Sequence, residues 1–283
     1  MSAPWPRGAV DGDHLSYRPH RRWFRRPDVV VPLLVIVAVY AYLLLGVEET
    51  SFFRTRMTAK GTEHFDWMYF WHLVPLMWRG LLVTAKATVM GFTIAATLGF
   101  VLALGRRSRL RILSWPTAAA IEFVRSTPLL VQLFFAQALV RSTDALSLEP
   151  ISILMVGLGV HYATYCSEAY RAGIDSVPKG QWEAATALNL GPATTWSRVI
   201  VPQAVPNVLP ALGNFLVAGF KDAPLGFILG VPGVLFFANT VRGEDFRPTE
   251  PYILAGIGFL MLSLPAAWAL RRLERRIAYE RTD

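Results

Sequence analysis

The sequence predicts an all-α fold, a polytopic bundle of transmembrane helices. Of its 283 residues, 53% are hydrophobic and only 17% are charged, whereas about a quarter of a typical soluble domain is charged. The mean hydropathy is +0.38. The hydrophobic residues come in blocks close to the ~20 residues with which a helix crosses the hydrocarbon core. Composition and block length together therefore indicate a membrane protein.

Six stretches are long and apolar enough to be transmembrane helices. They run from Val29 to Val47, from about Leu81 to Gly105, from about Ile112 to Val140, from Ile151 to about Ser167, from Val199 to Phe220 and from Tyr252 to Leu270. The third is expected to be a single span with Glu122 and Arg125 near its start. The fifth is interrupted by Pro202, Pro206 and Pro210. The chain is therefore expected to cross the membrane six times.

A seventh uncharged run, Ala223 to Val241, is expected not to be a full crossing. Six arginines precede the first span and five follow the last, and basic residues favour the cytoplasmic side. Both ends should therefore lie inside, which requires an even number of crossings. Two prolines and three glycines also interrupt the run. It is expected to be a partly re-entrant or outer-face segment that lines a pathway, because broken backbone at membrane depth needs protein or water around it.

The predicted organisation places a long membrane domain between two tails. Residues 1–28 are expected to be a basic, disordered cytoplasmic tail, 29–47 an N-terminal anchor, 48–72 an external segment, 73–276 the main transmembrane domain and 277–283 a cytoplasmic tail. The single cysteine, Cys166, excludes an internal disulfide and a cysteine metal cluster. No Gly-rich phosphate loop and no His-Glu-x-x-His pair occurs. No nucleotide site, metal or cofactor is therefore expected, and no motif accompanies the arginines to suggest nucleic acid.

The inner loop between the fourth and fifth spans has an ordered helical pattern. Gln181 to Leu188 is a good helix former with Glu183 in its first turn, where a negative charge suits the helix dipole. Asn189 and Gly191 follow, residue types that tolerate the left-handed backbone with which helices end. Pro192 then stands where a new helix can begin. The pattern predicts a short helix across the inner face, either docking another protein or lying at the lipid interface.

Several motifs in this order resemble the membrane subunits of ABC importers. Glu183-Ala184-Ala185, followed by a turn residue and by Ile200-Val201-Pro202, resembles their EAA loop. The segments that resemble the polar amino-acid permease family are Phe123 to Gln132, Arg171 to Ile174, Val177 to Gln181 and Pro202 to Ala204. The resemblance covers about Leu73 to Arg276. Within the family, His161 to Tyr165 and Gln181 to Leu190 look most like the ectoine/hydroxyectoine uptake permeases.

This resemblance implies the type I ABC importer permease fold, a five-helix core to which the span at 29–47 is an addition. It implies a transport subunit of the bacterial inner membrane that is not itself an enzyme. Two ATPase subunits, an extracytoplasmic solute-binding protein, a second permease subunit (a related chain or a second copy) and membrane lipid are the implied partners. The implied cargo is ectoine, hydroxyectoine or a polar amino acid. The residues of loop 172–202 implied to couple to the ATPase are Glu183, Ala184, Ala185, Leu188, Asn189 and Gly191.

Five ionisable residues in or near the spans are candidates for the solute pathway. They are Lys221, Asp222, Glu168, Arg125 and Glu122. A charge within a span costs ~2.5–3.5 kcal/mol on insertion scales, so it pairs or lines a polar cavity. Lys221 can pair with Asp222, and Glu122 with Arg125 at i, i+3 spacing. Such pairing is favoured over direct solute contact, and His161 and Tyr165 are expected to be packing residues.

Two departures from the family pattern bear on these candidates. Asn189 stands where the loop usually has glycine, and the chain reads Lys-Asp-Ala-Pro-Leu at 221–225 where the family usually reads Lys-Asp-Thr-Ser-Leu. The second change removes two hydroxyls and leaves the solute open. The alternative function is an ATP-independent channel or secondary transporter, which explains the spans but not the long inner loop. No paired carboxylates, metal cluster or nucleophile–base set supports a membrane-embedded enzyme.

Overall fold

The computed structural model describes residues 65–142 and 148–279. The described residues all belong to one compact unit, Ala59–Asp283. The tail at 1–28, the anchor at 29–47 and most of the segment at 48–72 lie outside the described residues, so what the sequence predicts of them stays a prediction. Every regular element among the described residues is helical, as the predicted fold class requires.

Two long helices form the centre of the described bundle. Helix α3 (Trp67–Arg106) contains the second predicted span and begins well before it. Helix α6 (Pro150–Asp175) contains the fourth and extends beyond it. On α3 small residues recur every fourth position and face α6; they are Gly91, Ala95, Gly99 and Ala103. A Cβ atom on Gly99 would lie 2.6 Å from the Cβ of Cys166 and 2.8 Å from the Ala163 carbonyl oxygen. The two backbones therefore approach as closely as small-residue crossings in membranes allow.

The start of α3 is held by charged side chains from the other end of the chain. Asp66 caps the helix by accepting hydrogen bonds from the backbone N–H groups of Met68 and Tyr69. Its other carboxylate oxygen lies 3.2 Å from a guanidinium nitrogen of Arg247. The Tyr69 N–H and then Arg247 hold the pKa of the Asp66 carboxyl below its usual range. Glu250, which is buried, accepts the Asp66 backbone N–H at 3.1 Å.

The third predicted span is wrong as a single helix. The structure divides it into α4 (Arg111–Arg125) and α5 (Leu129–Arg141), which meet at an angle of 108°. The break falls at Ser126 to Pro128, because a proline disfavours helical backbone at the residue before it. Two half-length helices, and not one continuous rod, therefore lie between α3 and α6 along the chain.

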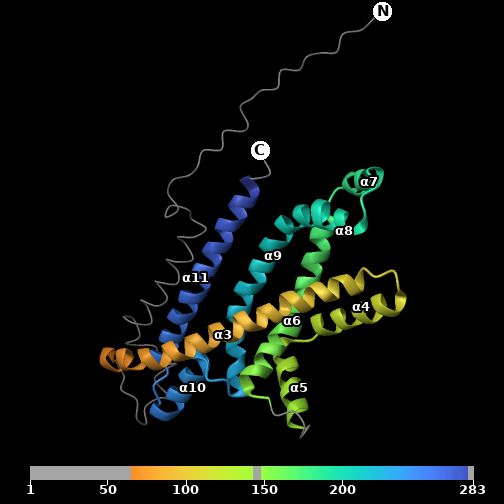
Figure 1. Cartoon of the computed structure of the whole chain (residues 1–283). Coiled ribbons are helices and arrows are strands. Elements are labelled where there is room, and N and C mark those ends of the chain that lie inside the picture. The colour runs from red at the N-terminus through yellow and green to blue at the C-terminus, as the bar shows by residue number, and fades with distance from the viewer. Residues whose placement is uncertain (1–64, 143–147, 280–283) are drawn as a thin grey trace, which may run out of the picture. The chain divides into compact units, whose positions relative to one another are not determined.

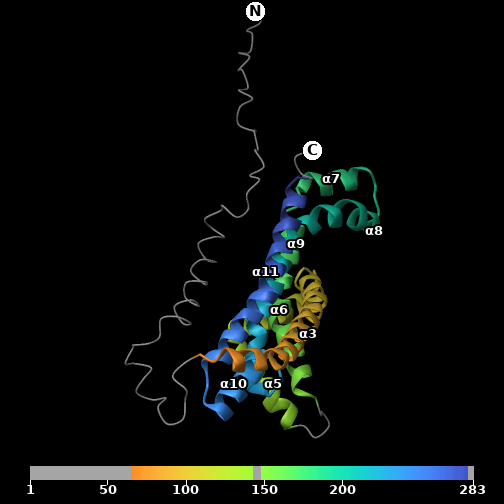
Figure 2. The same ribbon diagram turned by 90° about the vertical axis from the view of Figure 1, so that its left-hand side faces the viewer.

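The predicted short helix and turn of the inner loop are confirmed. Helix α7 (Lys179–Ala187) is followed by Asn189 in the left-handed conformation, with φ of 51°. A short turn, α8 (Pro192–Thr194), leads into the π-helical segment η2 (Thr195–Ile200) and then into α9 (Val201–Asp222). The prolines of the fifth predicted span are accommodated within α9. Figures 1 and 2 both show α7 at the end of the bundle at which α11 also ends.

The seventh apolar run is broken, as the sequence predicts. It forms a 3-10 helix, η3 (Ala223–Leu229), a turn at Gly230 with φ of 83°, and the first part of α10 (Val234–Asp245). Twelve residues of α10 extend only about 18 Å, so α10 is too short to cross a membrane. The last helix, α11 (Thr249–Tyr279), contains the sixth predicted span.

Length and composition identify the membrane-crossing segments among the described residues. Three qualify on their own: Trp67–Arg106, the continuous stretch Pro192–Leu229, and Thr249–Glu274. The bent α4–α5 pair gives a fourth if it is one crossing. Helix α6, at 26 residues, is long enough but carries several polar side chains along its length. Helix α6 packs against α3, α9 and α5 (Figure 1).

Candidate functional site

Aromatic side chains cluster where the middle of α6 meets α9. The ring centroids of His161 and Tyr162 lie 5.3 Å apart, and those of Tyr165 and Phe215 lie 5.8 Å apart. The rings of Tyr162 and Tyr165 join the two pairs at 6.1 Å. These distances fit the edge-to-face and tilted packing that aromatic rings prefer. His161 and Tyr165 thus pack against neighbouring rings, and whether they also contact a solute stays open. The four residues are called the aromatic cluster below.

Two opposite charges lie against the aromatic cluster. The guanidinium carbon of Arg125 is 5.4 Å from the centroid of the Tyr165 ring, within cation–π distance. The Asp222 carboxylate accepts a hydrogen bond from the Tyr162 hydroxyl at 2.6 Å. Neither Arg125 nor Asp222 forms an ion pair with another described residue. A cation and an anion that do not neutralise each other thus border one aromatic surface.

Gln132 stabilises the break between α4 and α5 beside this cluster. Its side-chain amide donates to the carbonyl oxygens of Val124, at 2.7 Å, and Thr127, at 2.9 Å. Its oxygen lies 3.2 Å from Nδ1 of His161. Broken backbone in a membrane protein needs such internal partners. Sequence reasoning did not single out Gln132; the signal that points to it is Pro128, whose position in an apparent span marks a break.

The ion pairs predicted within the spans do not form. Lys221 is exposed and Asp222 turns to Tyr162, because successive residues on a helix point about 100° apart. Glu122 is exposed as well, and Arg125 lies over Tyr165 although i, i+3 spacing would permit the pair. Of the five predicted pathway residues, the structure therefore brings Arg125 and Asp222 to the aromatic cluster and leaves Glu122 and Lys221 outside it.

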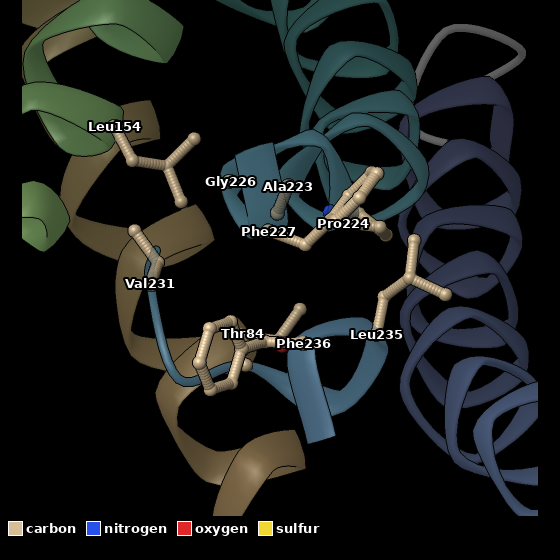
Figure 3. Close-up of a pocket in the computed structure, with 10 residues that line it drawn as sticks. Thr84, Leu154, Ala223, Pro224, Gly226, Phe227, Val231, Leu235 and Phe236 are labelled. Atoms are coloured by element: carbon tan, nitrogen blue, oxygen red, sulfur yellow. The ribbon is translucent and has the colours of Figure 1, made fainter. Parts of the chain in front are cut away.

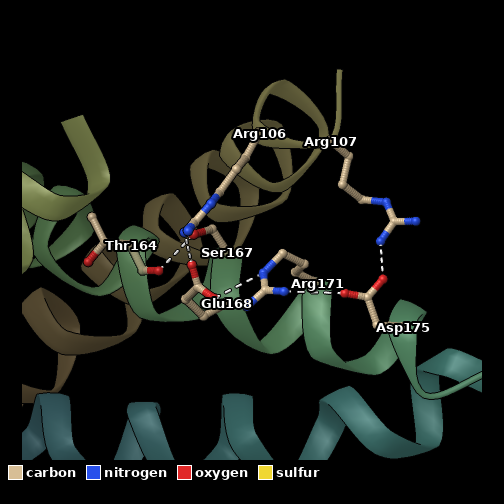
Figure 4. A network of polar contacts seen from close by, with 7 residues as sticks. All are labelled: Arg106, Arg107, Thr164, Ser167, Glu168, Arg171 and Asp175. Atoms are coloured by element: carbon tan, nitrogen blue, oxygen red, sulfur yellow. Dashed lines mark hydrogen bonds and ion pairs between the residues drawn. The ribbon is translucent and has the colours of Figure 1, made fainter. Parts of the chain in front are cut away.

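Glu168 belongs to a separate network of ion pairs between α3 and α6. Figure 4 shows its carboxylate between Arg106 and Arg171, and the same Arg171 reaches on to Asp175, which also pairs with Arg107. The Glu168–Arg171 contact is 2.8 Å. Glu168 stands six residues after Tyr162, about 9 Å farther along the helix axis. Glu168 is paired with two arginines, Arg106 and Arg171, so the structure does not bring it to the aromatic cluster with Arg125 and Asp222.

A small hollow lies between α3, α6, η3 and α10. Its lining is apolar except for Thr84, as Figure 3 shows. The Thr84 hydroxyl donates to the Gly80 carbonyl at 2.9 Å and accepts the Val234 backbone N–H at 3.2 Å. The one side-chain hydroxyl of the hollow is thus engaged in packing, and the hollow offers a polar solute less than the Arg125–Asp222 region does.

The inner loop presents a mixed surface. Glu183 and Ala184 are exposed on α7, and Leu188 at its end is 72% exposed. Ala185 is only 3% exposed. Its carbonyl accepts the Leu190 backbone N–H at 3.0 Å, in the turn around Asn189. Asn189 and Gly191 are exposed at that turn. Of the two alanines expected to permit close approach, Ala184 therefore faces outward and Ala185 packs inward.

The loop also has a small hydrophobic core of its own. Ile174, Val177, Ile200 and Ala204 are buried together, with Trp182 and Trp196 packed against them. A helix that only lay on lipid would not need a core shared with the ends of α6 and α9. The packing therefore favours a preformed element over a floating one.

Comparison with known sequences shows which proteins this chain is similar to. The family model "Binding-protein-dependent transport system inner membrane component" matches residues 95–279. The probable amino-acid ABC transporter permease protein y4tG of Sinorhizobium fredii is 38% identical over 199 residues, 70% of this chain and 86% of the relative. The glutamine transport system permease protein GlnP of Escherichia coli is 30% identical over 214 residues, 75% of this chain and 98% of the relative.

Solved structures agree in fold. An amino acid ABC transporter crystallised with histidines matches with a TM-score of 0.69 and 31% identity, over 75% of this chain and 99% of the other. The MetNI methionine ABC transporter in an inward-facing conformation matches with a TM-score of 0.59 and 20% identity, over the same shares of both chains. The fold is that of type I ABC permeases. The chain belongs to the family of inner-membrane components of binding-protein-dependent transport systems, as a multi-pass, non-enzymatic permease subunit of an amino-acid ABC importer.

Proposed function

We propose that this permease imports a zwitterionic solute, ectoine, hydroxyectoine or a polar amino acid, and that helix α7 couples import to the partner ATPase. The observation that carries the proposal is the placement of Arg125 and Asp222 at the aromatic cluster. A zwitterion carries one carboxylate and one cationic group, so it complements a site that offers one charge of each sign. Aromatic rings between the two charges add apolar cover.

The geometry of each charge favours solute contact over a purely structural role. Arg125 is exposed, and its guanidinium has N–H donors that can bind both oxygens of a carboxylate. Asp222 has a carboxylate oxygen beyond the one that Tyr162 occupies. Tyrosine faces also attract delocalised cations such as the ring cation of ectoine. Lys221 and Glu122, which are exposed, enter the proposal only as charges at the edge of the pathway, and Glu168 has no part in it.

The coupling role rests on the exposed surface of α7 and the turn after it. Glu183 supplies a carboxylate, Ala184 permits close approach, and Leu188 supplies an exposed apolar side chain for a cleft in the partner. Asn189 and Gly191 shape the turn, and Ala185 holds the helix to the loop core. In this proposal two ATPase subunits bind beneath a pair of permeases, and an extracytoplasmic binding protein delivers the solute on the other side.

Charge changes on α7 test the coupling role. Glu183→Lys and Ala184→Asp should leave the complex assembled and ATP hydrolysis measurable, while uptake of labelled solute falls about tenfold or more. Uptake is measured in cells that also express the ATPase and the binding protein, with ectoine, hydroxyectoine and polar amino acids as competitors. Glu149→Lys, an equal charge reversal at the opposite end of α6, is the matched control.

Three results would each contradict part of the proposal. Normal uptake by both α7 variants would remove the docking role of α7. Uptake that persists without the ATPase subunit would instead indicate a channel or a secondary transporter. If none of the zwitterions competes for uptake, the proposed solute class is wrong, while the coupling role of α7 is unaffected.

A further inference from the structure

We infer that Trp182 and Trp196 are positioning residues whose contact joins α7 to the base of α9, so that the two move as one unit. The inference rests on the proposed coupling function of α7. It assigns to a single aromatic contact the transfer of movement from the ATPase-facing helix to a membrane-crossing helix. Neither tryptophan belongs to the EAA motif or to its exposed surface.

The two indole rings meet edge to face between α7 and η2. Their centroids are 5.5 Å apart and their planes are inclined at 83°, the T-shaped arrangement that aromatic pairs favour. Both side chains are half-buried and cover the loop core of Ile174, Val177 and Ile200. Trp182 stands directly before Glu183, in the first turn of α7. A displacement of the docking surface therefore reaches Trp196 with few intervening atoms.

Polar contacts support the same attachment on the α9 side. The side-chain amide of Gln203 donates to the Gln181 side-chain oxygen at 3.3 Å. The Asn207 amide donates to the Ser176 hydroxyl at 2.6 Å. These hydrogen bonds tie the start of α7 and the end of α6 to the first turns of α9. Both are exposed, so water competes with them, whereas the indole contact is half-buried and rests on the buried loop core.

The backbone between Trp196 and α9 lacks some of the hydrogen bonds that make a regular α-helix stiff. Residues Thr195–Ile200 form a π-helical segment, in which the Val201 N–H bonds to the Trp196 carbonyl. Such segments are rare and concentrate at functional sites. Pro202, Pro206 and Pro210 then remove three backbone donors at every fourth position. Trp196 stands at the start of this stretch, and its packing against buried Ile200 and Ala204 carries a movement of α7 past the stretch to α9.

Tryptophan also serves as an anchor at membrane interfaces, with its ring directed to the headgroups. The geometry here differs, because each indole is directed at the other and at the loop core. The two roles predict different coupling between substitutions. Two independent anchors give additive effects, whereas one shared contact gives a double variant no worse than either single variant.

The test measures ATP hydrolysed per solute imported in the complete transporter in proteoliposomes. Trp182→Ala and Trp196→Ala should each raise this ratio about tenfold with normal amounts of bound ATPase, and the double variant should raise it no further. Trp182→Phe should restore the ratio, since it keeps an edge-to-face contact. Trp115→Ala, which removes an indole that is 75% exposed on α4, is the control.

Each other outcome overturns the inference. A normal ratio in Trp182→Ala, or effects of the two single variants that add, would show that the contact does not transmit movement. Trp182→Leu keeps apolar cover over the loop core and takes the place of the alanine variant if that variant does not reach the membrane. Failure of the wild-type chain to bind any ATPase would overturn the proposed function itself, and is recognised before any variant is made.

Discussion

The partners of Arg125 and Asp222 are residues that lie far from them in the sequence. They are far apart in the sequence, yet Tyr165 and Tyr162 of α6 bring them to one aromatic surface. Each has a neighbour of opposite charge within three residues, and neither uses it. An aromatic face leaves a cation able to bind a carboxylate, whereas an ion pair would have consumed that capacity.

The proposed solute site predicts how uptake changes when a single charge is removed. Asp222→Asn keeps an oxygen for the Tyr162 hydroxyl but removes the charge, so uptake should fall about tenfold or more with the complex intact. Arg125→Gln should act in the same direction for the opposite group of the solute. Both are read as initial uptake rates against the amount of permease in the membrane.

Glu244→Gln provides the control, because it removes an exposed carboxylate outside the aromatic cluster. If both cluster variants transported like that control, the charges would serve packing alone. An increase in the solute concentration for half-maximal uptake would locate the loss in binding.

Residue types at these positions could be predicted, but their partners could not. The sequence singles out Arg125 and Asp222 as costly charges within spans. It cannot show which way their side chains turn, because that depends on how α4 and α9 approach α6. Gln132 is an ordinary residue in the sequence and becomes important only because it bonds the carbonyls that the break at Pro128 frees.

At the scale of helices, hydropathy predicts each of the three described segments that are long and apolar enough to cross a membrane, and it misses one bend. The apolar residues continue on both sides of Ser126 to Pro128, so a window average sees a single stretch. The proline was the available signal. The inner helix and its left-handed turn were predicted well, because capping and turn residues act locally and need no tertiary partner.

The crossing of α3 and α6 also yields a prediction. Gly99→Val should destabilise the detergent-solubilised protein by about 2–3 kcal/mol, because overpacking forces backbone shifts. The new Cβ would meet the Ala163 carbonyl oxygen at 2.8 Å, and a backbone atom cannot rotate away. The measurement is the midpoint of thermal unfolding together with the yield of monodisperse protein.

Gly243→Val is the matched control, since that glycine is also within a helix and a Cβ there meets nothing within 4 Å. Equal stability of the two variants would show that the close approach of α3 to α6 is not required. A loss confined to Gly99→Val would identify the small-residue stripe as the contact that sets the crossing.

At the scale of the whole membrane domain, the distribution of arginines predicts the orientation that the proposed coupling role requires. The helix ends nearest the α7 loop carry arginines, among them Arg106, Arg171 and Arg272. Such residues favour the cytoplasmic side, where an ATPase is available to α7. The stretch Pro192–Leu229, which ends with η3, is long and apolar enough for one crossing. If α10 does not add another, we expect the residues after α10 to lie outside and the C-terminus, beyond α11, to lie inside.

Cysteine labelling distinguishes these topologies. The natural Cys166 is fully buried, so it should not react with a membrane-impermeant maleimide. Glu244→Cys, at the end of α10, should react in intact spheroplasts. Ala187→Cys, exposed on α7, should react only after the membrane is permeabilised. Protection of both would mean that the segment from Ala223 to Asp245 crosses back, and reaction of both in intact spheroplasts would place α7 outside, beyond the reach of any cytoplasmic ATPase.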